Sequence, residues 1–294
     1  MLDDSYCRTG VKLEEYYVDV SDGVELKIVD LIPEHDSPDN PLIVFVAGWI
    51  SLVSGWKDVL KRLTESYRTL YIETREKKSA RLPEKTKLDF SIRRMSLDIS
   101  EVLTKTVPSK RPFFMTGSSL GSTVVLDYMS QDVRLPDKAI LIAPVSEFPF
   151  PLWLLFIIRF IPAGFYLVVK PILKWYLRNI RLDKKNEPEQ VKKYEGTLDA
   201  AEPSRLKANA FAIKDYSLWG VLDRIKSPVL IIGAETDKHH GYDVLQKMVS
   251  MMPNAGFKLM KSNKETHSEK AADIILAQIN EHMEKRTENP IKSS

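Results

Sequence analysis

The chain has 294 residues, 44% of them apolar, and a formal net charge of only +3. This length suits one large domain with an insertion or two small domains, and the near-neutral charge argues against a dedicated nucleic-acid binder. The single cysteine, Cys7, excludes an internal disulfide and a metal site built from cysteines, and it favours a reducing, cytoplasmic location.

Strands that alternate with helices predict an α/β fold with a mostly parallel sheet covered on both faces. Alternating polarity around Ser21-Asp22-Gly23 predicts an N-terminal hairpin, and the start of the chain shows no secretory signal pattern. Apolar runs predict the other strands, and apolar stripes at helical spacing predict the helices. In chain order we expect strands at 15–20, 24–32 and 42–46, a helix at 56–63, a strand at 69–72, a helix at 92–103, a strand at 112–115, a helix at 122–128, strands at 139–143 and 229–232, a helix at 244–252, a strand at 257–260 and a helix at 272–283.

The most informative motif is Gly117-Ser118-Ser119-Leu120-Gly121, which follows one expected strand and precedes a helix. A buried strand, then Gly-x-Ser-x-Gly, then a helix is the order that a nucleophile elbow requires. The positions two residues either side of the nucleophile must lack bulky side chains, and both are glycine here. We therefore expect Ser119 Oγ to stand exposed above the sheet edge. The alternative is a Gly/Ser-rich turn without a catalytic role.

A serine hydroxyl needs a hydrogen-bonded base, and that base needs an acid to orient it. In this architecture the chain order is serine, acid, histidine. His267 is the expected base, because it lies in a loop between the last strand and the last helix, from which it can reach Ser119. The remaining histidines are less suitable: His35 precedes the elbow, His282 lies within the terminal helix, and His239 and His240 directly follow the candidate acid.

The expected acid is Asp237, which ends Gly233-Ala234-Glu235-Thr236-Asp237 after the strand at 229–232. An aspartate in such a loop is ordinarily a turn former. Glu235 is a nearby alternative, and Glu147, after the preceding strand, is a more distant one.

Residues 148 to about 220 interrupt the alternation between the sixth and seventh expected strands. The segment is rich in Trp, Phe, Leu and Ile, so an inserted helical cap fits better than a linker. The expected organisation is an α/β core of residues 1–147 and 221–294 with a helical cap of residues 148–220.

Over residues 12–285 the chain resembles the α/β-hydrolase fold superfamily, most closely its esterase, lipase and thioesterase members with a helical cap. The resemblance rests on the elbow at Ser119, the Gly-x-x-x-Asp loop at Asp237, His267, and Ala47-Gly48-Trp49 followed by Ser54-x-Trp56. It implies that the backbone N–H groups of Trp49 and Leu120 form the oxyanion hole. It implies no metal and no organic cofactor.

Three departures from the family pattern indicate a divergent branch. Ala47 stands where a histidine usually precedes the oxyanion glycine. Ser118 and Ser122 replace a frequent histidine and glycine in the elbow, and Glu73-Thr74-Arg75-Glu76 replaces Asp-x-Arg-Gly. None of these changes removes a catalytic atom, because backbone amides bind the oxyanion.

The expected cap combines apolar residues with positive charge. Residues 152–185 contain seven lysines and arginines but one acidic residue, Asp183. This positive charge suits an anionic membrane surface or an acidic acyl-carrier partner. The uninterrupted apolar run is too short to span a bilayer. The interpretation that we favour is that these residues pack against the sheet and cover an apolar pocket, with the lysines reaching water.

Together these features predict a serine hydrolase that cleaves carboxylic esters or thioesters with a medium or long acyl chain. The expected location is the cytoplasm, and peripheral contact with a membrane is the alternative. Ser119 attacks the carbonyl, His267 carries the proton and Asp237 fixes the imidazole. The alternatives are a catalytically weak or inactive lipid-binding protein on the same fold, and an acyl transferase or C–C hydrolase that uses the same residues.

Overall fold

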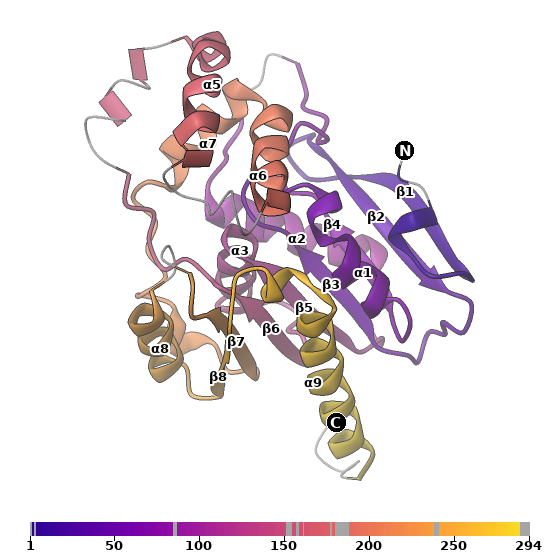
Figure 1. Ribbon diagram of the computed structural model, residues 1–294. Helices are drawn as coiled ribbons and strands as arrows, with labels where there is room; N and C mark the ends of the chain where they lie inside the picture. Colours follow the sequence, from indigo (N-terminus) through magenta and orange to yellow (C-terminus); the bar gives the residue numbers. More distant parts are fainter. Residues whose placement is uncertain are drawn as a thin grey trace.

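The structure, a computed structural model, is built around an eight-stranded sheet with helices on both faces (Figure 1). It describes residues 2, 4–84, 87–150, 155–156, 159–160, 162–176, 178–179, 188–237 and 241–288. The strand order is β1-β2-β4-β3-β5-β6-β7-β8. The strands are β1 (Val11–Asp19), β2 (Glu25–Pro33), β3 (Leu42–Val46), β4 (Arg68–Ile72), β5 (Phe113–Ser118), β6 (Lys138–Ile142), β7 (Val229–Ala234) and β8 (Ala255–Met260).

All eight predicted strands are confirmed, and most of the sheet is parallel. β1 and β2 form the predicted antiparallel hairpin, and β2 is antiparallel to β4. From β4 to β8 every neighbouring pair is parallel. The carboxyl ends of six strands, from β3 to β8, therefore lie at one edge of the sheet, called here the carboxyl edge.

The side chains of β3 show why the sheet must be covered on both faces. Leu42, Val44 and Val46 pack into one apolar cluster, whereas Ile43 and Phe45 pack into the other. Successive side chains of a strand point to opposite faces, and all five are buried. A continuous apolar run can be buried in this way only when helices cover both faces.

The helices divide between the two faces. One cluster holds the apolar sides of α2 (Ile92–Thr106), α3 (Leu120–Met129) and α8 (Tyr242–Met251). The other holds those of α1 (Lys57–Leu63) and α9 (Glu269–Glu288). The short helical turns are η1 (Asp4–Tyr6), η2 (Val53–Trp56), η3 (Ala163–Phe165), η5 (Leu222–Arg224) and η6 (Glu265–His267).

The described part of the predicted insertion, between β6 and β7, includes the helices α5 (Tyr166–Tyr176), α6 (Pro188–Ala200) and α7 (Pro203–Ile213). Figure 1 shows them beyond one end of the sheet. α7 is attached to the loops after β4, because Arg205 Nη1 donates to Ala80 O at 2.9 Å and Asn209 Nδ2 donates to Phe90 O at 2.7 Å. The boundaries 148 and 220, and the role of this segment as a cap, stay predictions.

The expectation that the large apolar residues of the insertion pack against the sheet is wrong for much of it. Seven of them, between Phe156 and Trp175, are exposed. Of the seven basic residues between 152 and 185, the structure describes four. Lys170, Lys174 and Arg178 form ion pairs with α6, and Arg159 is exposed. The remaining three, Arg181, Lys184 and Lys185, lie outside the described residues. In the part of the chain that the structure describes, no helix is long and apolar enough to cross a membrane.

Candidate active site

Ser119 lies at the turn between β5 and α3, with φ 49° and ψ −119°. A positive φ is strained for a residue with a side chain. The end of β6 holds the turn in place, because Ser119 N–H donates to Ile142 O at 2.9 Å and Ser122 Oγ donates to the same carbonyl at 3.1 Å. This strained strand-to-helix turn is the local geometry of a nucleophile elbow.

The two elbow glycines are required by the close approach of β3. A Cβ on Gly121 would lie 2.0 Å from Val46 O and 2.6 Å from Ala47 O. A Cβ on Gly117 would lie 2.8 Å from Val46 O. Real Cβ atoms do not come this near to backbone oxygens, so the steric reason predicted for these glycines is confirmed.

Strained backbone gathers at the carboxyl edge. Among the described residues, the non-glycine residues with positive φ are Ile50, Ser119 and Ala143. They follow β3, β5 and β6 respectively, and these strands are neighbours in the sheet. Such strain persists only where the surrounding structure imposes it, and it is concentrated at functional sites.

The candidate oxyanion donors belong to two segments that meet at Ser119. Trp49 follows Gly48 in the loop after β3, and a Cβ built on Gly48 would lie 3.1 Å from Ser118 O and 3.5 Å from Ser119 Cβ. Leu120 is the first residue of α3, where a helix has backbone N–H groups without an intrahelical acceptor. The structure therefore brings the loop after β3 against the elbow.

His267 ends η6 in the loop between β8 and α9, as the sequence predicts, and it is half-buried. Its Nδ1 lies 3.0 Å from Asn263 O and 3.1 Å from Thr266 Oγ1. A carbonyl oxygen can only accept, so the contact with Asn263 O places the proton of a neutral imidazole on Nδ1. Nε2 then carries the lone pair that a general base needs.

The Trp56 ring packs against the His267 ring, a contact that no sequence pattern predicts. The ring centroids are 4.3 Å apart with an interplanar angle of 31°. Trp56 is 1% exposed, and its Nε1 donates to Ser51 Oγ at 3.0 Å. The indole is therefore fixed at one end by the loop after β3 and packs on the imidazole with its face.

Asp237 lies just after β7, and two hydrogen bonds join its loop to the segment that carries His267. Asn263 N–H donates to Thr236 Oγ1 at 3.1 Å, and Glu235 N–H donates to Met260 O at 3.0 Å. Asp237 N–H closes the turn by donating to Ala234 O at 3.1 Å. The loops of the candidate acid and base are thus neighbours at the carboxyl edge.

The alternative residues have other surroundings. His35 Nε2 lies 3.1 Å from Ser66 O. The ring of His282 meets Phe114 edge-on. His282 lies in the second half of α9, which Arg286 connects to Asp137 at the start of β6. Glu147 accepts from Ser217 Oγ at 3.2 Å and is exposed. His239 and His240 lie outside the described residues.

The loop after β4, where the sequence departs from the family pattern, is buried and charged. Arg75 is fully buried and donates to both carboxylate oxygens of Asp98 and to Asp22, each at 2.6 Å. Glu76 is 2% exposed, and burial raises the pKa of its carboxyl group, partly opposed by Lys77. Glu76 Oε2 and Lys77 Nζ have no hydrogen-bond partner in the described structure.

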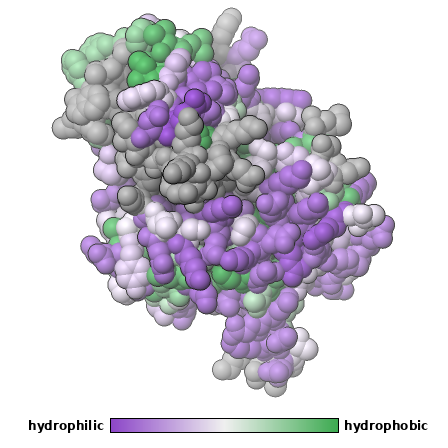
Figure 2. All heavy atoms as spheres, viewed as in Figure 1, coloured by the Kyte–Doolittle hydropathy of each residue, from purple (hydrophilic) through white to green (hydrophobic). Residues whose placement is uncertain are grey.

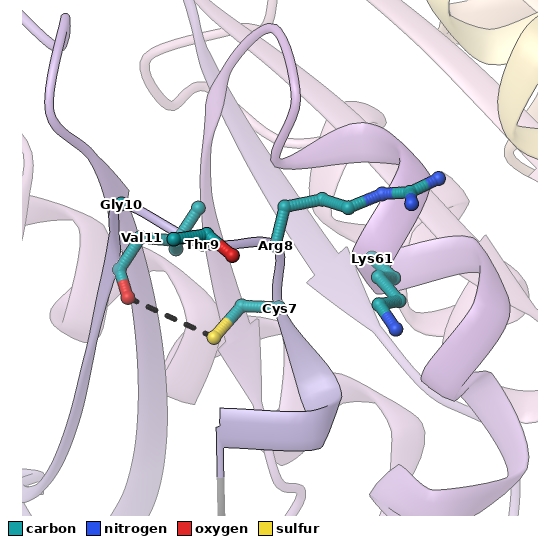
Figure 3. A pocket seen from close by; sticks show the side chains of 6 residues that line it. All are labelled: Cys7, Arg8, Thr9, Gly10, Val11 and Lys61. Atoms are coloured by element: carbon teal, nitrogen blue, oxygen red, sulfur yellow. Dashed lines mark hydrogen bonds between the residues drawn. The ribbon is translucent and has the colours of Figure 1, made fainter.

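Two cavities lie at opposite edges of the sheet. The smaller, about 110 Å³, lies between the loops after β3 and β4 and the α6–α7 junction. The larger, about 530 Å³, lies at the start of β1 (Figure 3). β1 begins opposite the end of β2, beside the start of β4, so this cavity is at the other edge of the sheet from Ser119. Its buried Cys7 thiol donates to Val11 O. Within the described ranges, no three His, Cys, Asp or Glu residues are placed to hold a metal ion.

No protein-family model matches the sequence, and no curated protein sequence matches it either. Solved structures do match. An esterase from Exiguobacterium antarcticum superposes with a TM-score of 0.73 at 16% identity, over 91% of this chain and 100% of its own. An enol-lactonase from Burkholderia xenovorans LB400 gives 0.72 at 17% identity, over 91% and 99%. A bromoperoxidase from Bacillus anthracis gives 0.72 at 14% identity, over 91% and 100%.

The chain has the α/β-hydrolase fold. The strand order and the doubly covered sheet agree with that fold, as the sequence predicts. Within an α/β-hydrolase fold the carboxyl edge is where a nucleophile elbow presents its side chain. The similar structures are named for different chemistries, so the fold by itself does not assign a reaction.

Proposed function

We propose that the protein is a serine hydrolase that cleaves carboxylic esters or thioesters with a medium or long acyl chain. The observation that carries the proposal is the strained Ser119 at the carboxyl edge, between two glycines whose places no larger residue can take. A fold can avoid such strain by placing glycine at the turn itself. Its retention on a serine is consistent with a catalytic use of the hydroxyl.

In the proposed reaction, Ser119 Oγ attacks the carbonyl carbon while His267 Nε2 takes the hydroxyl proton. The backbone N–H groups of Trp49 and Leu120 stabilise the oxyanion of the tetrahedral intermediate. His267 then returns the proton to the leaving alcohol or thiol, and an acyl-enzyme remains. Water, activated by the same imidazole, releases the acid. Asp237 stabilises the imidazolium that forms twice in this cycle.

The orientation of His267 supports the role given to it. Its Nδ1 lies 3.0 Å from Asn263 O, and because a carbonyl oxygen only accepts, Nε2 is the nitrogen left to act as the base. The proposal for Asp237 rests on its place after β7 and on the two hydrogen bonds between its loop and that of His267. A cytoplasmic location stays a prediction that rests on the single cysteine.

The test is hydrolysis of p-nitrophenyl esters from acetate to palmitate by the wild type and by Ser119→Ala. We expect turnover that rises with chain length and falls by about 10⁴-fold or more in the variant. A fluorophosphonate probe should label the wild type at Ser119, and His267→Ala should lose that labelling. Turnover that is indifferent to Ser119 would refute the proposal.

A non-catalytic lipid-binding role on the same fold is the alternative that Ala47 and Ser122 motivate. That protein would bind fatty acids but would neither react with the probe nor turn over any ester. An acyl transferase would react with the probe, and an added alcohol would then divert the acyl group from water. Measuring the ratio of free acid to new ester separates transfer from hydrolysis.

A further inference from the structure

Helix α5 exposes apolar residues and turns its charged residues inward, the reverse of a helix on a water-facing surface. Leu167, Val168, Ile172 and Trp175 are each 60–62% exposed. With 100° between successive residues, these four and Pro171 occupy one side of the helix. The solvent-facing side of α5 is therefore apolar along its whole length.

The other side of α5 is polar and fixed to α6. Lys170 Nζ and Lys174 Nζ lie 3.1 Å and 2.6 Å from the Asp199 carboxylate. Tyr166 Oη donates to Leu198 O at 2.8 Å. A rotation of α5 that buried its apolar side would break these three contacts, so its orientation is set by α6.

The apolar surface continues past the start of α5. Phe165 is 44% exposed, and Phe156 and Phe160 are 66% and 67% exposed, with ring centroids 4.9 Å apart. Seven of the twelve exposed large hydrophobic residues of the described structure lie between positions 156 and 175, so they form a patch and are not scattered. Figure 2 shows hydrophobic residues gathered at the end of the molecule that carries α5. We call these seven residues the α5 patch.

We propose that the α5 patch docks onto a lipid bilayer with its apolar side chains inserted at the interface. α5 has 11 residues, too few to span a bilayer but enough to lie in its surface. Trp and Phe side chains are typical of membrane interfaces. Arg159, exposed beside Phe160, complements anionic headgroups.

Charge also distinguishes a bilayer from other occupants. A second copy of the chain docked through the same patch would bring two exposed Arg159 side chains into one interface. Like charges at such close range oppose pairing. An acidic carrier protein would be held mainly by charge, yet Lys170, Lys174 and Arg178 are engaged by Asp199 and Glu195. Apolar insertion uses the residues that are free to make contact.

Co-sedimentation with vesicles tests this proposal, using full-length Ser119→Ala protein so that hydrolysis cannot alter the lipid. The vesicles are phosphatidylcholine alone and a two-to-one mixture of phosphatidylcholine and phosphatidylglycerol. We expect the protein to pellet with both, more strongly with the mixture. Ile172→Ser combined with Trp175→Ser should lower the vesicle-bound to free ratio at least about ten-fold, because it removes inserted apolar area without adding charge.

The matched control is Leu97→Ser on α2, an exposed apolar residue outside the patch, which should bind vesicles like the parent. Far-UV circular dichroism and the unfolding midpoint of the double variant should match the parent, since both residues are exposed. Binding that needs phosphatidylglycerol and disappears at high salt would overturn insertion and favour a charge-held partner such as an acidic carrier protein. Dimerisation without lipid that the double variant abolishes would also overturn the proposal.

Discussion

The indole ring of Trp56 lies against the imidazole ring of His267, with the ring centroids 4.3 Å apart. Trp56 belongs to η2, at the start of α1, whereas His267 ends η6, at the start of α9. Both helices cover the same face of the sheet. The packing of two covering helices thus fixes the ring of the proposed base, and an electron-rich indole face stabilises an imidazolium next to it.

We expect Trp56→Leu to lower kcat on a p-nitrophenyl ester about five-fold, which corresponds to about 1 kcal/mol of lost imidazolium stabilisation and orientation, while KM changes little. The control is Phe114→Leu, another buried aromatic residue of the same apolar cluster, whose ring meets His282 instead. Both variants should lose stability, but only Trp56→Leu should lose turnover per folded molecule. Equal losses of kcat would assign Trp56 a structural role alone.

The strands and the elbow could be predicted because local patterns determine them. The run Leu42–Val46 is apolar at every position, and a strand buried on both faces needs that. The elbow glycines follow from a steric rule that applies to any turn of this shape. Ser119, Asp237 and His267 fall at strand ends of a parallel sheet, so their common edge also follows from the chain order.

Contacts between distant segments could not be predicted. Trp56 belongs to an apolar helical stripe and to the Ser54-x-Trp56 pattern, and neither indicates a partner near residue 267. The cluster of Arg75 with Asp22 and Asp98 is built from three segments that are separated in sequence. The inverted orientation of α5 depends on Asp199, which lies on another helix. Periodicity indicates that a helix has two sides but not which side faces its neighbour.

Gly121→Ala should prevent the native elbow from forming. The added Cβ would lie 2.0 Å from Val46 O. Val46 belongs to β3, which is paired with a strand on each side, so its backbone cannot move without breaking the sheet. We expect a loss of several kcal/mol or no soluble protein. Gly196→Ala, within α6 and with nothing within 4 Å of the new Cβ, should instead raise stability by up to about 1 kcal/mol. Soluble yield and thermal unfolding measure both, and a Gly121→Ala protein as stable as wild type would contradict the elbow geometry.

Ser119→Gly should be more stable than Ser119→Ala, although neither should hydrolyse esters. Alanine keeps the strain of φ 49°, whereas glycine adopts positive φ freely. The relieved strain, about 1–3 kcal/mol, exceeds the extra chain entropy that glycine loses on folding, about 0.5–1 kcal/mol. Chemical denaturation of the two variants gives the difference directly. Alanine as the more stable residue would show that the turn is relaxed around Ser119.

Arg75→Met should destabilise the fold by about 3 kcal/mol, because the carboxylate of Asp98, which is 2% exposed, then keeps only Arg94 of its two arginine partners. Adding Asp98→Leu to Arg75→Met should recover part of that loss, because it removes the buried carboxylate that Arg94 alone would have to compensate, while Arg94 keeps its ion pair with Glu101. Arg81→Met is the control, because Arg81 pairs with Glu25 and stacks on Tyr17 at the surface, and it should cost about 1 kcal/mol or less. Denaturant unfolding would contradict the prediction if Arg75→Met and Arg81→Met behaved alike.

Glu76→Gln should gain stability relative to wild type as the pH rises. Burial raises the pKa of Glu76 in the folded state above its ordinary value of 4.5. Below pH 4.5 the Glu76 carboxyl is protonated in both the folded and the unfolded chain, so it does not lower the free energy of unfolding. Above it the unfolded chain ionises first, so folding must take up a proton, and stability falls until the pH passes the raised folded-state pKa. Glutamine has no such dependence.

Thermal unfolding from pH 4 to pH 8 should show that the stability difference between Glu76→Gln and wild type grows with pH. The control is Glu14→Gln, which removes a carboxylate on β1 whose side chain is 40% exposed, and this variant should not show the trend. A difference that stays constant with pH would mean that Glu76 is ionised alike in the folded and unfolded chain.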